Sequence, residues 1–293
     1  MTELDVTLRD GRTLHVYDDG DPDGHPVVVH HGTPGSGLLY GPEIDDAREK
    51  GLRLIGYDRA GYGGSSPKPG RSVADVAADI ADVLDHLGIE RFAGVGGSGG
   101  GPHSLALGAL LVGRCVGVCA IASPAPWQAE GLDWLQGQGD QNRAEWAAAL
   151  EGPEALEPRL EQDGAELLGA SAEQIREVLS TILSPVDREV VTGALAEYIH
   201  ASTARALRPG IAGWRDDDLA FTRPWGFELG AIATPVLLWQ GVQDLMVPPD
   251  HGRWLAERIP GVEAHISEED GHLTISERRM PEIHEWLLGL FHP

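Results

Sequence analysis

Short, continuously apolar segments, separated by helical patterns, are the feature that most restricts the fold of this 293-residue chain. They lie at residues 27–29, 52–55, 92–95, 115–121 and 236–239, and a further strand is expected near residues 262–266. Strands that are buried on both faces of a parallel sheet are continuously apolar, because helices cover both sides of the sheet. The alternation therefore predicts right-handed βαβ units in a doubly wound α/β fold.

The strongest helical pattern covers residues 72–87. Its apolar residues recur at helical spacing and its aspartates occupy the opposite face. Ser72 and Asp75 have the spacing of a capping box, and Gly88 is a typical helix end. Further helices are expected at residues 102–111, 250–258 and 280–290.

Two β-rich runs, at residues 5–9 and 13–17, flank Asp10-Gly11 and predict an N-terminal hairpin. With this hairpin we expect a mostly parallel, eight-stranded sheet that has helices on both faces.

The pattern changes between residues 126 and 226, which contain helical patterns and no convincing strand. Five of the eight tryptophans lie in this stretch, namely Trp127, Trp134, Trp146, Trp214 and Trp225. We therefore expect a core domain formed by residues 1–125 and 227–293, with residues 126–226 inserted as an all-helical cap. The cap tryptophans could line an apolar pocket or pack the cap on the core.

Charge and residue composition exclude several classes of protein. The chain has 46 acidic and 22 basic residues, a net charge of −24. Such a chain is repelled by nucleic acid and by anionic membranes, so we expect neither as a partner. Cys115 and Cys119 are separated by about 13 Å on one strand, too far for a disulfide. His30 and His31 point to opposite faces, and no Cys/His cluster indicates a metal. No targeting or membrane-spanning segment is visible, so a cytoplasmic location is expected.

Residues 96–100 read Gly-Gly-Ser-Gly-Gly and match the pattern G-x-S-x-G. Such a short motif also fits a flexible loop or a phosphate-binding loop, although a Walker loop would require a lysine that is absent here. The motif follows an expected strand and opens an expected helix. On such a turn Ser98 is strained, and Gly96 and Gly100 are needed because a side chain would not fit.

A serine hydroxyl is a poor nucleophile without a base. If the order along the chain is serine, acid, histidine, then Asp244 is the candidate acid and His272 is the candidate base. Asp244 follows the apolar strand that ends at Trp239, and His272 lies on the loop after the next expected strand, so both belong at the same sheet edge as Ser98. Taken singly, a turn-forming aspartate and a loop histidine are the simpler interpretations. Asp250 is an alternative acid, although the prolines before it favour a helix start.

Acyl transfer also requires N–H donors for the developing oxyanion. Residues 30–36 follow the first apolar run and contain glycines that let the backbone approach a ligand. We expect the first donor to be the N–H of Thr33. The second is the N–H of Gly99, because it lies at the positive end of the helix that follows Ser98.

Five segments, at residues 31–35, 57–63, 96–100, 241–248 and 271–272, together resemble the α/β-hydrolase fold superfamily. The resemblance runs nearly end to end, with a helical cap after the sixth strand. It implies Ser98 as nucleophile, His272 as base, Asp244 as the residue that orients the base, and Thr33 with Gly99 as oxyanion hole. It implies no cofactor, and a structural role for residues 57–63.

The resemblance favours a serine hydrolase that cleaves carboxylic esters of a small-molecule substrate. Proline iminopeptidases are similar at residues 31–35, but they have Gly in place of Thr33 and usually Trp in place of Gly99. Serine-dependent carbon–carbon hydrolases are another alternative. Epoxide hydrolases and haloalkane dehalogenases of this fold use Asp at the elbow, so Ser98 disfavours both. A non-enzymatic alternative is a ligand-binding receptor with a hydrolase fold. The sequence leaves the oligomeric state open.

Overall fold

The computed structural model describes residues 1–127 and 129–292 of the chain. Eight strands form one sheet in the order β1-β2-β4-β3-β5-β6-β7-β8. Their bounds are β1 (Thr2–Thr7), β2 (Thr13–Gly20), β3 (His25–His30), β4 (Leu52–Tyr57), β5 (Phe92–Gly97), β6 (Cys115–Ile121), β7 (Val236–Gly241) and β8 (Glu263–Ser267). β1 and β2 pair antiparallel, as do β2 and β4, whereas every other pair is parallel. The predicted mostly parallel, eight-stranded sheet is confirmed.

The N-terminal hairpin is also confirmed, with shifted strand ends. β1 begins at Thr2 and ends at Thr7, so Arg9 lies in the turn and not in the strand. The turn closes by a hydrogen bond of 2.8 Å from the Leu8 N–H to the Arg12 carbonyl, and Gly11 adopts a φ of 85°. That positive φ is the reason for a glycine at this position.

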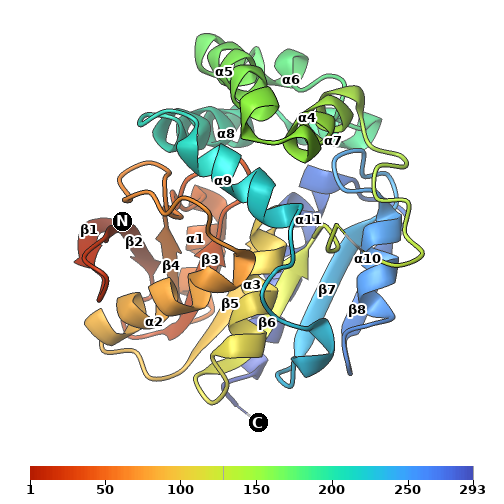
Figure 1. Ribbon diagram of the computed structural model, residues 1–293. Helices are drawn as coiled ribbons and strands as arrows, with labels where there is room; N and C mark the ends of the chain where they lie inside the picture. Colours follow the sequence, from red (N-terminus) through yellow and green to blue (C-terminus); the bar gives the residue numbers. More distant parts are fainter. Residues whose placement is uncertain (128, 293) are drawn as a thin grey trace.

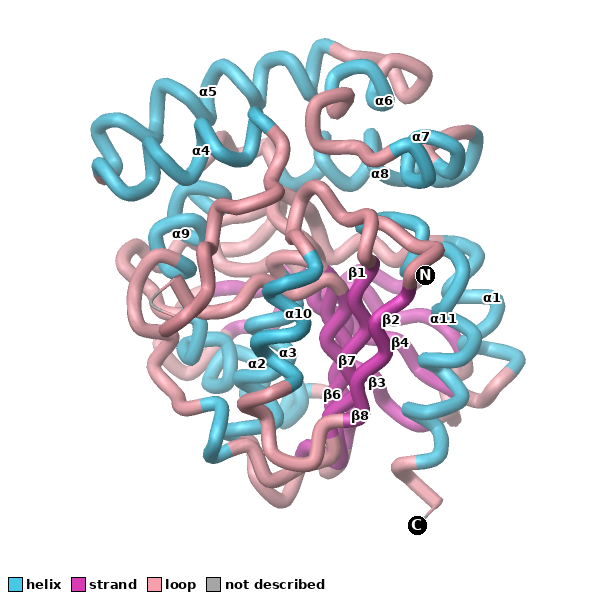
Figure 2. The backbone as a smooth tube through the Cα atoms, turned by 90° about the vertical axis from the view of Figure 1, so that its right-hand side faces the viewer, coloured by secondary structure: helices cyan, strands magenta, loops and turns pink. Residues whose placement is uncertain are grey.

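Helices cover both faces of the sheet, as Figure 2 shows with the sheet seen nearly edge-on. On one face lie α2 (Val76–His86), α3 (Gly100–Leu110) and α10 (Pro249–Ala256); on the other lie α1 (Gly41–Glu49) and α11 (His272–Gly289). Each face has its own apolar cluster, and the central strands are buried between the two clusters, whereas β1 and β8 at the edges are partly exposed. The expected capping box is present, because the Ser72 N–H donates to the Asp75 carboxylate at 2.7 Å. It closes η1 (Val73–Asp75), which leads into α2.

Two helix starts differ from the sequence-based expectation. α3 begins at Gly100, two residues earlier than expected. α11 begins at His272 rather than at residue 280, so His272 opens a helix and does not lie on a loop. Pro281 lies inside this helix. A proline is usual in the first turn of a helix, and this is why residues 280–281 look like a helix start in the sequence.

Between β6 and β7 the described residues form helices and no strand. These are α4 (Asp140–Glu151), α5 (Pro153–Gly169), α6 (Ile175–Val178), α7 (Pro185–Val190), α8 (Gly193–Ala206), α9 (Ala212–Phe221) and the short η2 (Leu229–Ala231). Figure 1 shows α4 to α8 stacked above one end of the sheet, with α9 between them and the sheet. We call α4 to α9 the helical layer. Its helices share an apolar cluster that includes Leu156, Leu160 and Trp214.

Cys115 and Cys119 are both buried free thiols, so the prediction that they form no disulfide is confirmed. Across residues 1–127 and 129–292, no helix is both long enough and apolar enough to cross a lipid bilayer.

Candidate active site

Ser98 stands on the sharp turn between β5 and α3. Its φ is 53°, a left-handed conformation that is costly for a residue with a side chain. The Ser98 N–H holds the turn by donating to the Ile121 carbonyl of β6 at 2.8 Å. A Cβ added to Gly96 would lie 2.2 Å from the Gly100 carbonyl oxygen, and one added to Gly100 would lie 2.3 Å from the His30 carbonyl oxygen. The expected steric need for both glycines is confirmed.

Asp244 and His272 are brought together from the ends of β7 and β8. The Nδ1 atom of His272 lies 2.7 Å from Oδ2 of Asp244, and both side chains are buried. Oδ1 of Asp244 accepts hydrogen bonds of 2.8 Å from the backbone N–H groups of Met246 and Val247. These contacts hold the carboxylate in place and leave its second oxygen for the imidazole. The Nδ1 atom therefore carries the proton, and Nε2 is left as the basic nitrogen.

The alternative acid, Asp250, is elsewhere. It lies in the first turn of α10, is exposed, and pairs with Arg253 at 2.9 Å. This is the helix-start role that its sequence context favours.

The electrostatics of His272 favour its protonated form. Burial alone lowers the pKa of His272, but the charge of Asp244, its hydrogen bond to the ring and the charge of Asp187 outweigh burial. The pKa of His272 is therefore raised above its ordinary value. A base with a raised pKa stabilises the imidazolium that forms when it accepts a proton.

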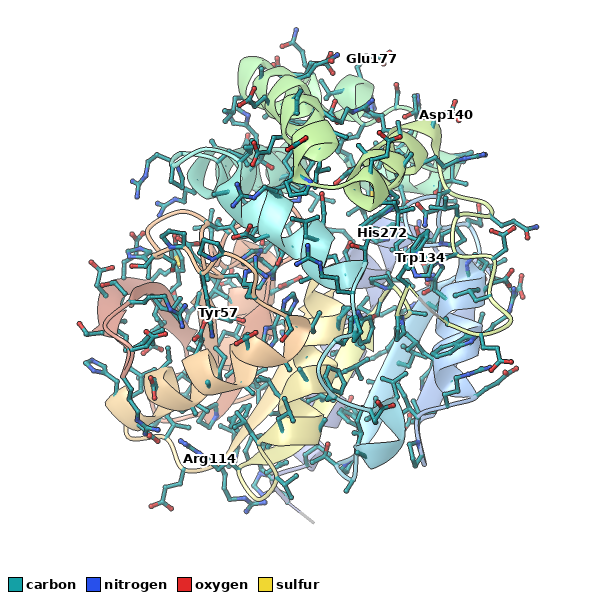
Figure 3. All side chains as sticks on the ribbon, in the orientation of Figure 1. Tyr57, Arg114, Trp134, Asp140, Glu177 and His272 are labelled. Atoms are coloured by element: carbon teal, nitrogen blue, oxygen red, sulfur yellow. The ribbon has the colours of Figure 1, made fainter. Side chains whose placement is uncertain are left out.

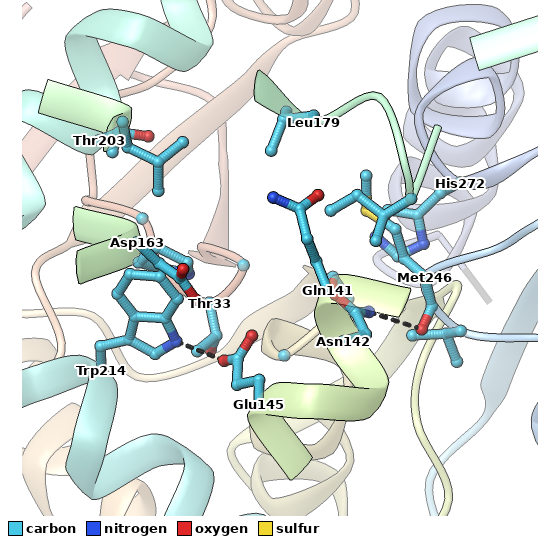
Figure 4. A pocket seen from close by; sticks show the side chains of 18 of the residues that line it. Thr33, Gln141, Asn142, Glu145, Asp163, Leu179, Thr203, Trp214, Met246 and His272 are labelled. Atoms are coloured by element: carbon cyan, nitrogen blue, oxygen red, sulfur yellow. Dashed lines mark hydrogen bonds between the residues drawn. The ribbon is translucent and has the colours of Figure 1, made fainter. Parts of the chain in front are cut away.

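Four of the five residues proposed from the sequence line one cavity of about 290 Å³, namely Thr33, Ser98, Gly99 and His272. The fifth, Asp244, does not line it and contacts the His272 ring instead. The cavity lies between the carboxyl edge of the sheet and the helical layer, where Figure 3 labels His272 and Trp134. Figure 4 shows its interior. Among the described residues, the Ser98 hydroxyl and the His272 ring share the cavity without a hydrogen bond between them. In unliganded enzymes such contacts commonly tighten when substrate binds.

The two expected oxyanion donors are neighbours. A Cβ added to Gly99 would lie 2.3 Å from Oγ1 of Thr33, so the loop after β3 touches the start of α3. Neither the Thr33 N–H nor the Gly99 N–H donates to another group within the described residues, and both residues line the cavity. The 11-residue helix α3 directs its positive end at the same point.

A buried ionic network supports this loop from behind, and sequence reasoning missed it. Oδ2 of Asp217 in α9 accepts hydrogen bonds from Oγ1 of Thr33 at 2.8 Å and from NH2 of Arg59 at 2.7 Å. Oδ1 of Asp217 pairs with Arg71 at 2.6 Å. Burial raises the pKa of Asp217, but the charges of the two arginines outweigh it and hold the pKa well below its ordinary value. In the sequence, Asp217 belongs to a run of three aspartates, which is typical of a solvated surface.

A second missed residue is Asp187 of α7. It is fully buried and accepts hydrogen bonds from the backbone N–H groups of His272, Leu273 and Thr274 at 2.9 to 3.0 Å. These three groups open α11 and have no partner within a helix. The sequence around Asp187 resembles an ordinary helix start, with Ser184 as its N-cap, and contains no signal of a role for Asp187 beyond its own helix.

The chain is similar to several known proteins along most or part of its length. Over 261 residues the chain is 26% identical to a putative carbamate hydrolase, RutD, from Variovorax paradoxus, covering 88% of this chain and 89% of that protein. It is 30% identical over 150 residues to epoxide hydrolase B from Mycobacterium tuberculosis, covering 49% of this chain and 42% of that protein. An esterase structure from Exiguobacterium antarcticum has a TM-score of 0.71 at 20% identity, with full coverage of both chains. These three similar proteins are hydrolases, and this protein is a hydrolase as well. The family model described as alpha/beta hydrolase fold matches residues 25–278, so the chain belongs to the α/β-hydrolase fold family.

Proposed function

We propose that this protein is a serine hydrolase that cleaves carboxylic esters of small molecules through Ser98, His272 and Asp244. The observation that carries the proposal is the 2.7 Å contact between His272 and Asp244 at a cavity that also contains the strained Ser98. A histidine base held by a carboxylate beside a serine on a tight turn is the arrangement that activates a hydroxyl as a nucleophile.

In the proposed mechanism, Oγ of Ser98 attacks the ester carbonyl while Nε2 of His272 takes its proton. The carbonyl oxygen becomes an oxyanion, which accepts hydrogen bonds from the N–H groups of Thr33 and Gly99. Each such donor contributes about 3 kcal/mol to transition-state stabilisation. The imidazolium then protonates the departing alcohol, and an acyl-enzyme remains on Ser98. Water, deprotonated by His272, attacks this ester and releases the carboxylic acid.

We further propose that the helical layer acts as the cap expected for residues 126–226. It supplies much of the cavity wall, including Trp146 of α4 and Trp214 of α9. An apolar cover of this kind strengthens the electrostatic interactions beneath it by excluding water. The wall is also mostly apolar, which suits a small organic substrate.

The names of the relatives support acyl transfer at a carbonyl. The carbamate hydrolase matches over nearly its full length, and a carbamate presents a carbonyl that a serine attacks as it attacks an ester. The epoxide hydrolase matches over less than half of its length. Its reaction, opening a strained ether, is disfavoured here because Ser98 stands where epoxide hydrolases of this fold use aspartate. A purely ligand-binding protein would not require the buried base and its carboxylate.

The proposal is tested with p-nitrophenyl acetate and a fluorophosphonate probe. We expect the wild type to hydrolyse the ester and to be labelled on Ser98, whereas Ser98→Ala does neither and keeps its circular dichroism spectrum. Ser171→Ala, at an exposed serine of the helical layer, is the matched control and should retain both properties. Equal hydrolysis by wild type and Ser98→Ala would remove Ser98 from the mechanism, and an inert wild type would favour a binding protein.

A further inference from the structure

Two carboxyl groups from different helices meet in the wall of the cavity. Glu145 lies on α4 and Asp218 lies on α9, and both line the cavity. Oε1 of Glu145 accepts a hydrogen bond of 2.7 Å from the indole N–H of Trp214, as Figure 4 shows. Asp218 is fully buried, and neither of its oxygens receives a hydrogen bond from an N–H or hydroxyl of the described residues. A buried carboxylate without a donor is costly, so this position requires a partner.

The nearby arginines are already paired with other carboxylates. Arg59 and Arg71 both contact Asp217, at 2.7 and 2.6 Å. On α5, the guanidinium of Arg159 contacts Asp163 at 2.6 Å. Within the described part of the chain, no lysine or arginine lies within ion-pair distance of Glu145 or Asp218. The pair is therefore an acidic element of the cavity wall without an ion-pair partner among the described residues, although the charges of Arg159 and Arg71 act on it from a distance.

The pKa values of Glu145 and Asp218 also reflect the absence of an ion-pair partner. Burial, followed by the charge of Glu145, raises the pKa of Asp218 well above its ordinary value. Burial likewise raises the pKa of Glu145 to about 7, against the opposing effects of hydrogen bonds with Asp218 and Trp214. Without a ligand, the two groups therefore hold a proton between them near neutral pH. A bound cation would replace that proton.

The pair lies beside the proposed oxyanion hole. Asp217, the residue before Asp218, accepts the hydrogen bond of the Thr33 hydroxyl. One turn further along α9, Phe221 would be 3.2 Å from a Cβ added to Gly99. α9 thus lies beside both residues of the proposed oxyanion hole, so a group bound at Asp218 would lie near the reacting carbonyl.

The rest of the wall suits an organic cation better than a metal ion. The indole rings of Trp146 and Trp214 and the phenyl ring of Phe221 line the same cavity, and aromatic faces attract ammonium groups. The described residues contain no group of three or more His, Cys, Asp or Glu side chains that could hold a metal ion.

We propose that Glu145 and Asp218 form a subsite for the ammonium group of the substrate, so that the preferred ester carries a primary or secondary amine on its acyl part. This inference rests on the proposed ester hydrolysis for its position in the reaction, but binding of the ammonium group can be measured without turnover. The ammonium group donates hydrogen bonds to both carboxylates, and the apolar part of the substrate packs on the indole rings.

The first experiment compares two esters of nearly equal shape. L-Alanine methyl ester and methyl 2-methylpropanoate differ in one ammonium group in place of one methyl group. We expect kcat/KM of the wild type to be at least about tenfold higher for the alanine ester, equivalent to about 1.4 kcal/mol. Glu145→Gln and Asp218→Asn should each move this ratio toward one. Glu161→Gln, which removes an exposed charge from α5 outside the cavity, is the matched control and should leave the ratio unchanged.

The second experiment measures binding alone and uses wild-type protein. Benzylammonium chloride and benzyl alcohol are titrated in phosphate and in HEPES buffer. We expect saturable binding of the cation at least about tenfold tighter than that of the alcohol, with heats that differ between the buffers because a proton is released. This readout does not depend on whether a substituted carboxyl disturbs folding.

The outcomes separate the two proposals. If both esters are hydrolysed at equal rates and the cation binds no better than the alcohol, the ammonium subsite is wrong and ester hydrolysis stands. If neither ester is hydrolysed but the cation binds with proton release, the subsite stands and the proposed function fails. A preference for the alanine ester that survives Glu145→Gln and Asp218→Asn together also overturns the assignment of these residues.

Discussion

The carboxylate of Asp187 accepts a hydrogen bond of 2.9 Å from the backbone N–H of His272, although the two residues are 85 positions apart in the chain. Asp187 belongs to the helical layer, whereas His272 belongs to the layer of helices packed on the sheet. The same carboxylate accepts hydrogen bonds from the N–H groups of Leu273 and Thr274, so it caps the first turn of α11. The position of the candidate base therefore depends on a residue that is supplied by the helical layer.

Replacing Asp187 with asparagine tests this dependence. Asparagine keeps the shape of the aspartate side chain but removes its charge and one of its two acceptor oxygens. We expect kcat to fall by about 10- to 100-fold because a small displacement of a catalytic group is costly. The acid limb of the pH–rate profile should also move to lower pH, since the charge of Asp187 contributes to the raised pKa of His272. Steady-state kinetics from about pH 5 to 9 measures both effects, because an imidazole titrates within roughly pH 5 to 8.

Glu189→Gln is the matched control for this variant. Glu189 is an exposed acid on the same helix α7, and its replacement should change neither kcat nor the acid limb. A lower kcat in Asp187→Asn with an unmoved acid limb would mean that Asp187 acts only on the stability of the helix.

The pH dependence of the wild-type enzyme follows from the electrostatics of His272. Protonated imidazole cannot accept the proton of Ser98, so activity is lost as pH falls through the pKa of His272. Because that pKa is raised above 6.5, half of the activity should already be lost at a pH above 6.5. The rate should then fall about tenfold for each further pH unit. A profile of kcat/KM for p-nitrophenyl acetate that stays flat down to pH 6 would contradict the assignment of His272.

Asp244→Asn tests the proposed orienting role. Asparagine can still accept hydrogen bonds from the N–H groups of Met246 and Val247, so the loop after β7 should remain folded. The histidine would lose its charged partner and its tautomer would no longer be fixed, so we expect kcat to fall by about 10⁴-fold. Asp250→Asn is the control, since Asp250 is exposed and pairs with Arg253. Equal activity of both variants would show that the acid has been assigned wrongly.

Asp217→Asn should affect stability more than any surface substitution. It removes the charge that compensates two buried guanidinium groups, those of Arg59 and Arg71. Leaving a buried charge without its partner costs about 3 to 5 kcal/mol in the free energy of unfolding. Urea denaturation measures this loss.

Asp216→Asn is the comparison for that measurement. Asp216 is itself buried, but its partner Arg215 reaches solvent, so we expect a change of about 1 kcal/mol or less. Similar losses in both variants would indicate that the network around Asp217 does not depend on its charge.

Gly96→Ala tests the steric basis of the turn at Ser98. The new methyl group would meet the Gly100 carbonyl at 2.2 Å, and we expect a loss of about 1 to 3 kcal/mol in the free energy of unfolding, together with reduced activity. Gly169→Ala at the end of α5 adds the same methyl group where nothing lies within 4 Å. It should be neutral or stabilise the protein by about 0.4 to 1 kcal/mol. Thermal unfolding and ester hydrolysis distinguish the two variants.

Local patterns in the sequence were sufficient to predict the sheet and the candidate triad. The strand before Ser98 is apolar over its whole length because both of its faces are covered, and this property is written in consecutive residues. Likewise, the order Ser98, Asp244, His272 can be read directly, because parallel strands bring all of their carboxyl ends to one edge. The pairing of His272 with Asp244 and not with Asp250 agrees with the helix-start context of Asp250.

The start of α11 could not be predicted in this way. The N–H groups of its first turn are satisfied by Asp187, which is distant in sequence, and a proline at 281 suggests a later start. A capping residue that is supplied by another helix leaves no pattern among residues that are neighbours in the sequence.

What the sequence by itself determined is the set of elements and the identity of the groups that can react, because periodicity and short motifs depend on nearby residues. What only the tertiary structure decided is the state of the charged groups. Asp217 and Asp218 are adjacent and chemically identical in the sequence, yet one is paired with two arginines and the other has none. Their pKa values move in opposite directions because burial and charged neighbours are set by packing between distant segments.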